Sequence, residues 1–183
     1  MRRAFIATAF ILAAAINLLG ATLAGVTLPD STDVGGKKLV LNGMGLRTKM
    51  MFKVYVGGLY LEQKSADANA ILKADAPKRV VMQMLRDLSR DQMVEAFTEQ
   101  FEANTPTWQS MKADIDKMLG AFEPTKTGEQ MVFTYQPGTG TTLTIGGKDK
   151  VTIPGHAFGQ AMFACWLGPK PPSGDLKKGM LGT

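Results

Sequence analysis

The chain has 183 residues, of which 45% are hydrophobic, and a formal net charge of +5 at pH 7. This length suits a single domain with a hydrophobic core of its own. The charge excess is small and scattered, with no basic run interleaved with aromatic residues, so nucleic acid is not expected as a partner. One histidine and one cysteine cannot form a His/Cys zinc site, and we expect neither a metal nor a cofactor.

The amino terminus has the three parts of a secretory signal. A pair of arginines precedes a short apolar run, and Thr22 and Ala24 then occupy the two positions that a signal peptidase reads. The alternative is a membrane-spanning anchor, for which the apolar run is short. We therefore expect residues 1–24 to be a signal peptide. Residues 25–183 are expected to form one exported domain, in the periplasm and without stable insertion in a membrane.

The segment after this signal is expected to begin with strands. β-Branched and alternating residues predict strands at 39–42 and 49–61, with a Gly-rich turn between them. Gly57-Gly58 is the place where a bulge or bend would be easiest in the second strand. Ser65 can cap a short helix to about residue 72, and residues 78–85 predict the next strand.

Two helices are expected in the middle of the chain. Ser89 and Gln92 have the spacing of a capping box, which predicts a helix start. Thr105-Pro106 predicts a second start, with threonine as the N-cap and proline at the first helical position. The first helix carries four residues at helical spacing on one face, namely Met93, Phe97, Phe101 and Asn104.

Short strands and two further helices complete the chain. The strands are expected at 131–135, 141–145 and 151–153, a helix at 155–167, and a last helix capped by Ser173. Strands joined by short turns, with helices grouped between and after them, indicate an antiparallel α+β domain. Cys165 shares a helix face with Phe158 and Met162, and as the single cysteine of an exported chain it is expected to be a buried, reduced thiol.

Arg47 is the residue that raises a functional question. It lies in an apolar stretch, LNGMGLRTKMMFKVYVGGLYL, and Tyr55 follows at an even spacing, which along one strand returns to the same face. An arginine aimed at an apolar interior needs an anionic or carbonyl partner, because an unpaired buried charge is very costly. From the residues alone, the partner of Arg47 can be either a protein carboxylate or a ligand.

This stretch resembles the signature of the chalcone isomerase family. Two later segments, FTEQFEANTP and IPGHAFGQAMFACWLGPKPPSGDLKKGMLG, resemble the same family in order and spacing. The resemblance extends from about residue 39 to residue 182. It implies an open-faced β-sandwich, in which a large antiparallel sheet is covered by helices and a ligand cleft lies between them.

The resemblance also implies site positions. The isomerases of this family use an arginine, a strand threonine, a helix tyrosine, an asparagine and a polar residue near the end of the last long helix. The matching positions here are Arg47, Tyr55, Phe97, Asn104 and Cys165, so only the arginine and the asparagine are kept. The loss of the helix tyrosine, at Phe97, argues against the isomerase reaction.

Non-catalytic members of the family, which resemble fatty-acid-binding proteins, match better, because there an arginine and a tyrosine hold the carboxylate of the ligand. We therefore predict an exported, non-catalytic protein that binds a fatty acid or similar amphipathic carboxylate. The predicted ligand-binding residues are Arg47, Tyr55, Phe97, Phe101, Asn104 and Cys165. Two alternatives stay open. One is an isomerase or intramolecular lyase acting on a phenolic or enone substrate, with Arg47 and Asn104 as candidate catalytic residues; the other is a scaffold with an empty cleft.

Overall fold

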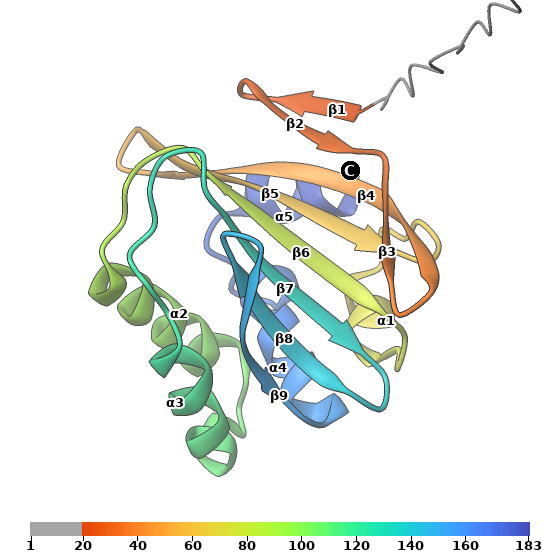
Figure 1. Cartoon of the computed structure of the whole chain (residues 1–183), viewed down its shortest axis with the longest axis vertical. Coiled ribbons are helices and arrows are strands. Elements are labelled where there is room, and N and C mark those ends of the chain that lie inside the picture. Colours follow the sequence, from red (N-terminus) through yellow and green to blue (C-terminus); the bar gives the residue numbers. More distant parts are fainter. Residues whose placement is uncertain (1–19) are drawn as a thin grey trace, which may run out of the picture.

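The computed structural model describes residues 20–183 (Figure 1). Most of the expected signal peptide, residues 1–19, lies outside the described residues. Its expected processing site lies inside them, at a turn between strand β1 (Gly20–Leu23) and strand β2 (Val26–Pro29), which pair as a small antiparallel hairpin. Cleavage after Ala24 would therefore remove β1 from the folded chain.

The main sheet has seven antiparallel strands, and each strand pairs with the one before it in the chain. Because every connection joins spatial neighbours, the sheet needs no crossover and the α+β prediction is confirmed. The strands are β3 (Ser31–Val34), β4 (Lys37–Lys49), β5 (Phe52–Leu61), β6 (Lys78–Met84), β7 (Gln130–Gln136), β8 (Gly140–Ile145) and β9 (Lys148–Ile153).

Helices cover one face of this sheet (Figure 1). They are α1 (Ala68–Lys73), α2 (Arg90–Asn104), α3 (Lys112–Gly120), α4 (His156–Leu167) and α5 (Gly174–Leu181), with a 3-10 turn, Trp108–Met111, before α3. Helix α4 packs against α1, α2 and β8, and α5 packs against β4 and β5. The β1–β2 hairpin covers part of the opposite face, where the Tyr60 hydroxyl donates to the carbonyl of Pro29 at 2.8 Å.

The expected Gly-rich turn before Arg47 is wrong, because β4 continues without a break from Lys37 to Lys49. The glycines of this stretch instead allow α5 to lie directly on the strand. A Cβ atom at Gly45 would lie 2.1 Å from the carbonyl oxygen of Leu176, and one at Gly43 would lie 2.2 Å from that of Gly179. Only glycine permits so close an approach of helix and strand backbones.

The hairpin turn between β4 and β5 consists of Met50 and Met51, which the sequence pattern placed inside a strand. Register shifts occur in the β4–β5 pairing, between Leu41 and Gly43 and between Arg47 and Thr48. No shift occurs at Gly57-Gly58, the place where a bulge would have been easiest.

The helix starts follow local capping chemistry in part. The Ser89–Gln92 capping box is present at the start of α2, as predicted. Thr105 caps the end of α2 rather than the start of the next helix, since its N–H donates to the carbonyl of Phe101 at 2.9 Å. Asp67, and not Ser65, caps α1, because its carboxylate accepts from the N–H groups of Asn69 and Ala70.

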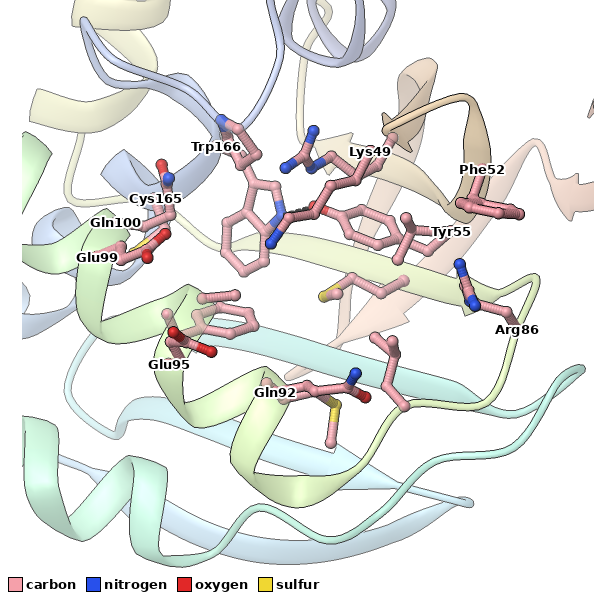
Figure 2. A pocket seen from close by; sticks show the side chains of 18 of the residues that line it. Lys49, Phe52, Tyr55, Arg86, Gln92, Glu95, Glu99, Gln100, Cys165 and Trp166 are labelled. Atoms are coloured by element: carbon pink, nitrogen blue, oxygen red, sulfur yellow. Dashed lines mark hydrogen bonds between the residues drawn. The ribbon is translucent and has the colours of Figure 1, made fainter.

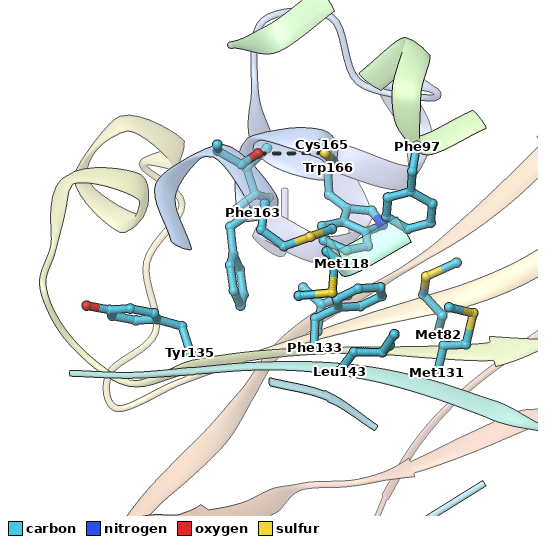
Figure 3. Close-up of a cluster of buried hydrophobic side chains, with 14 of the residues drawn as sticks. Met82, Phe97, Met118, Met131, Phe133, Tyr135, Leu143, Phe163, Cys165 and Trp166 are labelled. Atoms are coloured by element: carbon cyan, nitrogen blue, oxygen red, sulfur yellow. Dashed lines mark hydrogen bonds between the residues drawn. The ribbon is translucent and has the colours of Figure 1, made fainter. Parts of the chain in front are cut away.

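The hydrophobic core lies between the sheet and the helices (Figure 3). Phe97 of α2 is at its centre, with ring centroids 5.1 Å from Phe122, 5.4 Å from Phe133 and 5.5 Å from Trp166. Edge-on and tilted contacts of this kind are the favourable geometries for aromatic rings. The methionines Met82, Met118 and Met131 fill the space around these rings (Figure 3).

Candidate ligand-binding site

A pocket of about 320 Å³ opens between the β4–β5 hairpin and α2, with its inner end against α4 (Figure 2). Its inner wall is mostly apolar and comes from β5, β6, the loop between β6 and α2, α2 and α4. The side chains of that wall are Val54, Met82, Leu88, Met93, Phe97 and Trp166. This volume is within the usual range for small-molecule sites, about 300–1,000 Å³.

Arg47 and Tyr55 line the pocket together, as the sequence predicted. The reason differs from the prediction. They are direct partners across the β4–β5 hairpin, and residues opposite one another in an antiparallel pair present their side chains on the same face. The hairpin turn, and not an even spacing along one strand, brings them together.

The Arg47 guanidinium has few protein partners. Its only side-chain hydrogen bond within residues 20–183 is from Nη1 to the carbonyl oxygen of the adjacent Thr48. No carboxylate within the described part of the chain forms an ion pair with it. Arginine offers five N–H donors in a planar fork, so most of its donor capacity is available to a bound group.

Tyr55 is buried, with 6% of its surface exposed, and its hydroxyl meets the indole of Trp166. The Trp166 Nε1–H donates to the Tyr55 oxygen at 3.2 Å. Indole nitrogen is only a donor, so this bond leaves the hydroxyl hydrogen of Tyr55 free. No acceptor for that hydrogen is found among residues 20–183. The phenol therefore keeps one donor for a ligand.

Burial raises the pKa of the Tyr55 hydroxyl well above its ordinary value, although the Trp166 hydrogen bond and the charge of Arg47 oppose this rise. A phenol in this state stays protonated at every physiological pH. It can donate a hydrogen bond, but it cannot act as a base.

Cys165 also lines the pocket and is a free, buried thiol, which agrees with its predicted burial. Its Sγ donates to the carbonyl of Ala161 at 3.6 Å, one turn earlier in α4. Burial raises the pKa of this thiol far above its ordinary value, which disfavours the thiolate needed for nucleophilic chemistry.

Phe97 lines the pocket, whereas two other predicted contacts do not. Phe101 is buried between α2 and α4, with its ring 6.1 Å from that of Phe158. The Asn104 amide joins the end of α2 to the segment after α4. Its Nδ2 donates to the carbonyl of Lys170 at 2.9 Å, and its Oδ1 accepts from the Lys170 N–H at 2.8 Å.

Sequence reasoning missed Trp166, which both lines the pocket and fixes the Tyr55 hydroxyl. A signal for it was present, because it follows Met162 by one helical turn and so lies on the buried side of α4. Charged residues of the rim were also missed. Lys49 and Arg86 line the hairpin side, and Glu95 and Glu99 line the α2 side (Figure 2).

The described residues show neither a metal site nor a membrane-spanning helix. Residues 20–183 contain no cluster of three or more His, Cys, Asp or Glu side chains arranged to hold a metal ion. Within that same span no helix is long and apolar enough to cross a membrane.

A curled antiparallel sheet with helices over one face and a pocket between the two layers defines the chalcone isomerase class of fold. The chain belongs to the chalcone isomerase-like family, whose model matches residues 20–182. A crystal structure of the Arabidopsis thaliana fatty-acid binding protein AtFAP1 superposes with a TM-score of 0.68, over 86% of this chain and 92% of that one. At 15% sequence identity, this likeness concerns the fold. Among curated proteins, no significant sequence match is found.

Proposed function

We propose that the protein is a non-catalytic carrier that binds a fatty acid or a similar amphipathic carboxylate in the pocket between the hairpin and α2. The observation that carries this proposal is the Arg47–Tyr55 pair. Both residues face an apolar pocket, and both hold hydrogen-bond donors that the described protein atoms leave unused.

A carboxylate satisfies this arrangement. The guanidinium can donate two parallel bonds to its two oxygens, and the Tyr55 hydroxyl can supply a third donor. An alkyl chain would then extend along Met82, Met93 and Phe97. Each methylene removed from water contributes about 0.8 kcal/mol, so the chain adds to the affinity that the head group supplies.

The likeness in fold to a plant fatty-acid binding protein supports the same function. The isomerase alternative receives less support from the site. It requires Asn104 to orient a substrate, whereas the amide of Asn104 is bonded to Lys170 and lies outside the pocket lining. Phe97, in place of the family's tyrosine, offers no hydroxyl to order water.

The test is a titration of wild type and Arg47→Ala with a fatty acid in vesicle-free solution, by calorimetry. We expect the substitution to weaken binding by about 2–4 kcal/mol, because a charge-assisted, bidentate contact of the half-buried arginine is lost. Lys148→Ala, at an exposed position on β9 and outside the pocket, is the control for loss of one positive charge. The methyl ester of the same acid is the control ligand, since it has no charge to lose.

Thermal melts of the same variants separate binding from folding. Arg47 has no carboxylate partner within residues 20–183, so its removal should leave the melting temperature nearly unchanged. A large fall in melting temperature with unchanged affinity in the folded protein would reject the carboxylate-anchor role.

We also propose that this carrier acts in the periplasm after removal of an amino-terminal signal. The support is the sequence pattern of the first 24 residues. Mass spectrometry of the protein from a periplasmic extract gives the mature first residue. Protein that starts at Met1 and fractionates with membranes would contradict export.

A further inference from the structure

The turn between β4 and β5 exposes three consecutive large apolar side chains. Met50 is 83% exposed, Met51 is 98% exposed and Phe52 is 60% exposed. They are the exposed large hydrophobic residues of the described chain, and they gather at one place. Single exposed apolar residues are ordinary on protein surfaces, but a contiguous group of them indicates a contact site.

The backbone of this turn does not account for the methionines. Met50 and Met51 both have positive φ, at 49° and 69°. A two-residue hairpin turn with positive φ at both positions favours Asn-Gly, because large side chains are strained there. Neither burial nor turn chemistry therefore selects methionine at these two positions.

Positive charges surround the β4–β5 tip, which consists of Met50, Met51 and Phe52. Lys49 and Lys53 flank it in sequence, and the Arg86 guanidinium lies 4.8 Å from the centroid of the Phe52 ring. All three are exposed, and none forms an ion pair with a carboxylate in residues 20–183. The carboxylates of the pocket rim, Glu95 and Glu99, belong to α2 on the other side of the opening (Figure 2).

The tip is also part of the pocket rim, because Met50 and Phe52 line the opening. Apolar side chains that project beyond a ring of lysine and arginine match the boundary between anionic head groups and acyl chains. We propose that the β4–β5 tip docks on an anionic phospholipid bilayer, with Met50, Met51 and Phe52 entering the boundary and the cations meeting the lipid phosphates.

This proposal rests on the proposed function in one respect, since it supplies the source of the ligand. Docking through the tip would place the pocket opening against the bilayer. An amphipathic carboxylate could then pass between the membrane and the Arg47–Tyr55 pair without crossing water. The docking itself needs no bound fatty acid and can be tested without one.

The experiment places an environment-sensitive fluorophore, NBD, on the tip through Met51→Cys. The native Cys165 is buried, so the introduced thiol is the one that reacts. The matched control carries the same probe at Thr139→Cys, which is exposed in the β7–β8 turn at the opposite end of the sheet. Vesicles are phosphatidylcholine alone or phosphatidylcholine with one third phosphatidylglycerol, free of fatty acid. The full chain is used in the form that accumulates in cells.

We expect a blue shift of the tip probe with the anionic vesicles and no shift of the control probe. Lys49→Gln with Lys53→Gln should weaken vesicle partitioning by roughly fivefold for each charge removed, and added salt should weaken it further. Because the probe reports on residue 51, an apolar amino terminus that binds lipid by itself does not produce this signal.

A second variant separates docking from folding. Met50→Asn with Met51→Gly installs the residues that this turn prefers, so the melting temperature should rise while vesicle association falls at least severalfold. Association that is unchanged in this variant would overturn the proposal. So would a tip-probe shift that depends on protein concentration without vesicles, which indicates a second copy as the occupant, or equal binding to uncharged vesicles.

The outcome is independent of the carrier assay. Failure of fatty-acid titration in vesicle-free solution would reject the proposed function and leave vesicle docking unaffected. If vesicle docking fails while the fatty-acid titration in solution succeeds, only the docking surface is rejected.

Discussion

The hydrogen bond between Trp166 and Tyr55 gives the most detailed prediction. Tyr55→Phe removes the hydroxyl that accepts from the indole N–H at 3.2 Å, and Trp166 is almost completely buried, with 1% of its surface exposed. An N–H left without a partner in such a place costs about 1–3 kcal/mol. The bond is long and joins two neutral groups, so we expect a loss near the lower end, about 1 kcal/mol in the free energy of unfolding.

A double-mutant cycle isolates this bond from the loss of the ring. Urea denaturation is measured for wild type, Tyr55→Phe, Trp166→Phe and the double variant. Trp166→Phe costs more than Tyr55→Phe because it also leaves a cavity, but the cavity is present in both arms and cancels. We expect a coupling energy of about 1 kcal/mol, close to the contribution of one neutral hydrogen bond.

The same Tyr55→Phe variant tests the donor role of the hydroxyl. Fatty-acid affinity should fall by about 1 kcal/mol, because one neutral donor to the carboxylate is lost. Two results would refute the reasoning together: additive unfolding energies in the cycle, and unchanged affinity in Tyr55→Phe. They would mean that the indole does not fix the hydroxyl and that the hydroxyl does not meet the ligand.

Two further predictions concern charge. Glu95→Gln with Glu99→Gln should tighten binding of a carboxylate by less than about 1 kcal/mol, since both groups are exposed and screened; the gain should vanish at high salt, and calorimetry at two salt concentrations checks it. Burial lowers the pKa of Lys78 from 10.5 to about 8, although the nearby charge of Asp75 acts to raise it. Between these two pKa values the unfolded state holds the proton that the folded state has released, so stability should rise with pH across that window. Lys78→Met should lose this rise, and denaturation curves at pH 8 and pH 10 that keep the wild-type difference would show that another group is responsible.

The features that the sequence predicted well depend on neighbouring residues. The Ser89–Gln92 capping box and the buried face of α2 are set within one or two helical turns, and both are present. The β4–β5 hairpin was missed because Met50-Met51 carries no turn residue, although both positions have positive φ. Gly43 and Gly45 suggested a turn, but their role depends on α5, which is distant in sequence, and only the fold shows it.

The site was predicted only in part, because some of its contacts join elements that are distant in sequence. Arg47 and Tyr55 were placed on one face by an even spacing along one strand, whereas the hairpin that the sequence did not reveal makes them cross-strand partners. Asn104 was assigned from its position in the family pattern, which gives residue types in order but not the contact between Asn104 and the backbone of Lys170. Trp166 could be placed on the buried side of α4, but its bond to Tyr55 joins α4 to β5 and required the fold.

The ligand-free contact of Arg47 bears on how tightly a carrier would hold its ligand. The bond to the Thr48 carbonyl uses one of the five N–H donors of Arg47, and a carboxylate that takes this donor replaces a charge-assisted bond worth about 1.5–3 kcal/mol. A bidentate pair with a carboxylate joins two opposite charges through two such bonds, so the exchange favours the ligand. Thr48 lies at the bulge between Arg47 and the Met50-Met51 tip. A tip that moves on contact with a bilayer would therefore act on the acceptor that competes with the ligand, and the same β4–β5 hairpin would set both capture and release.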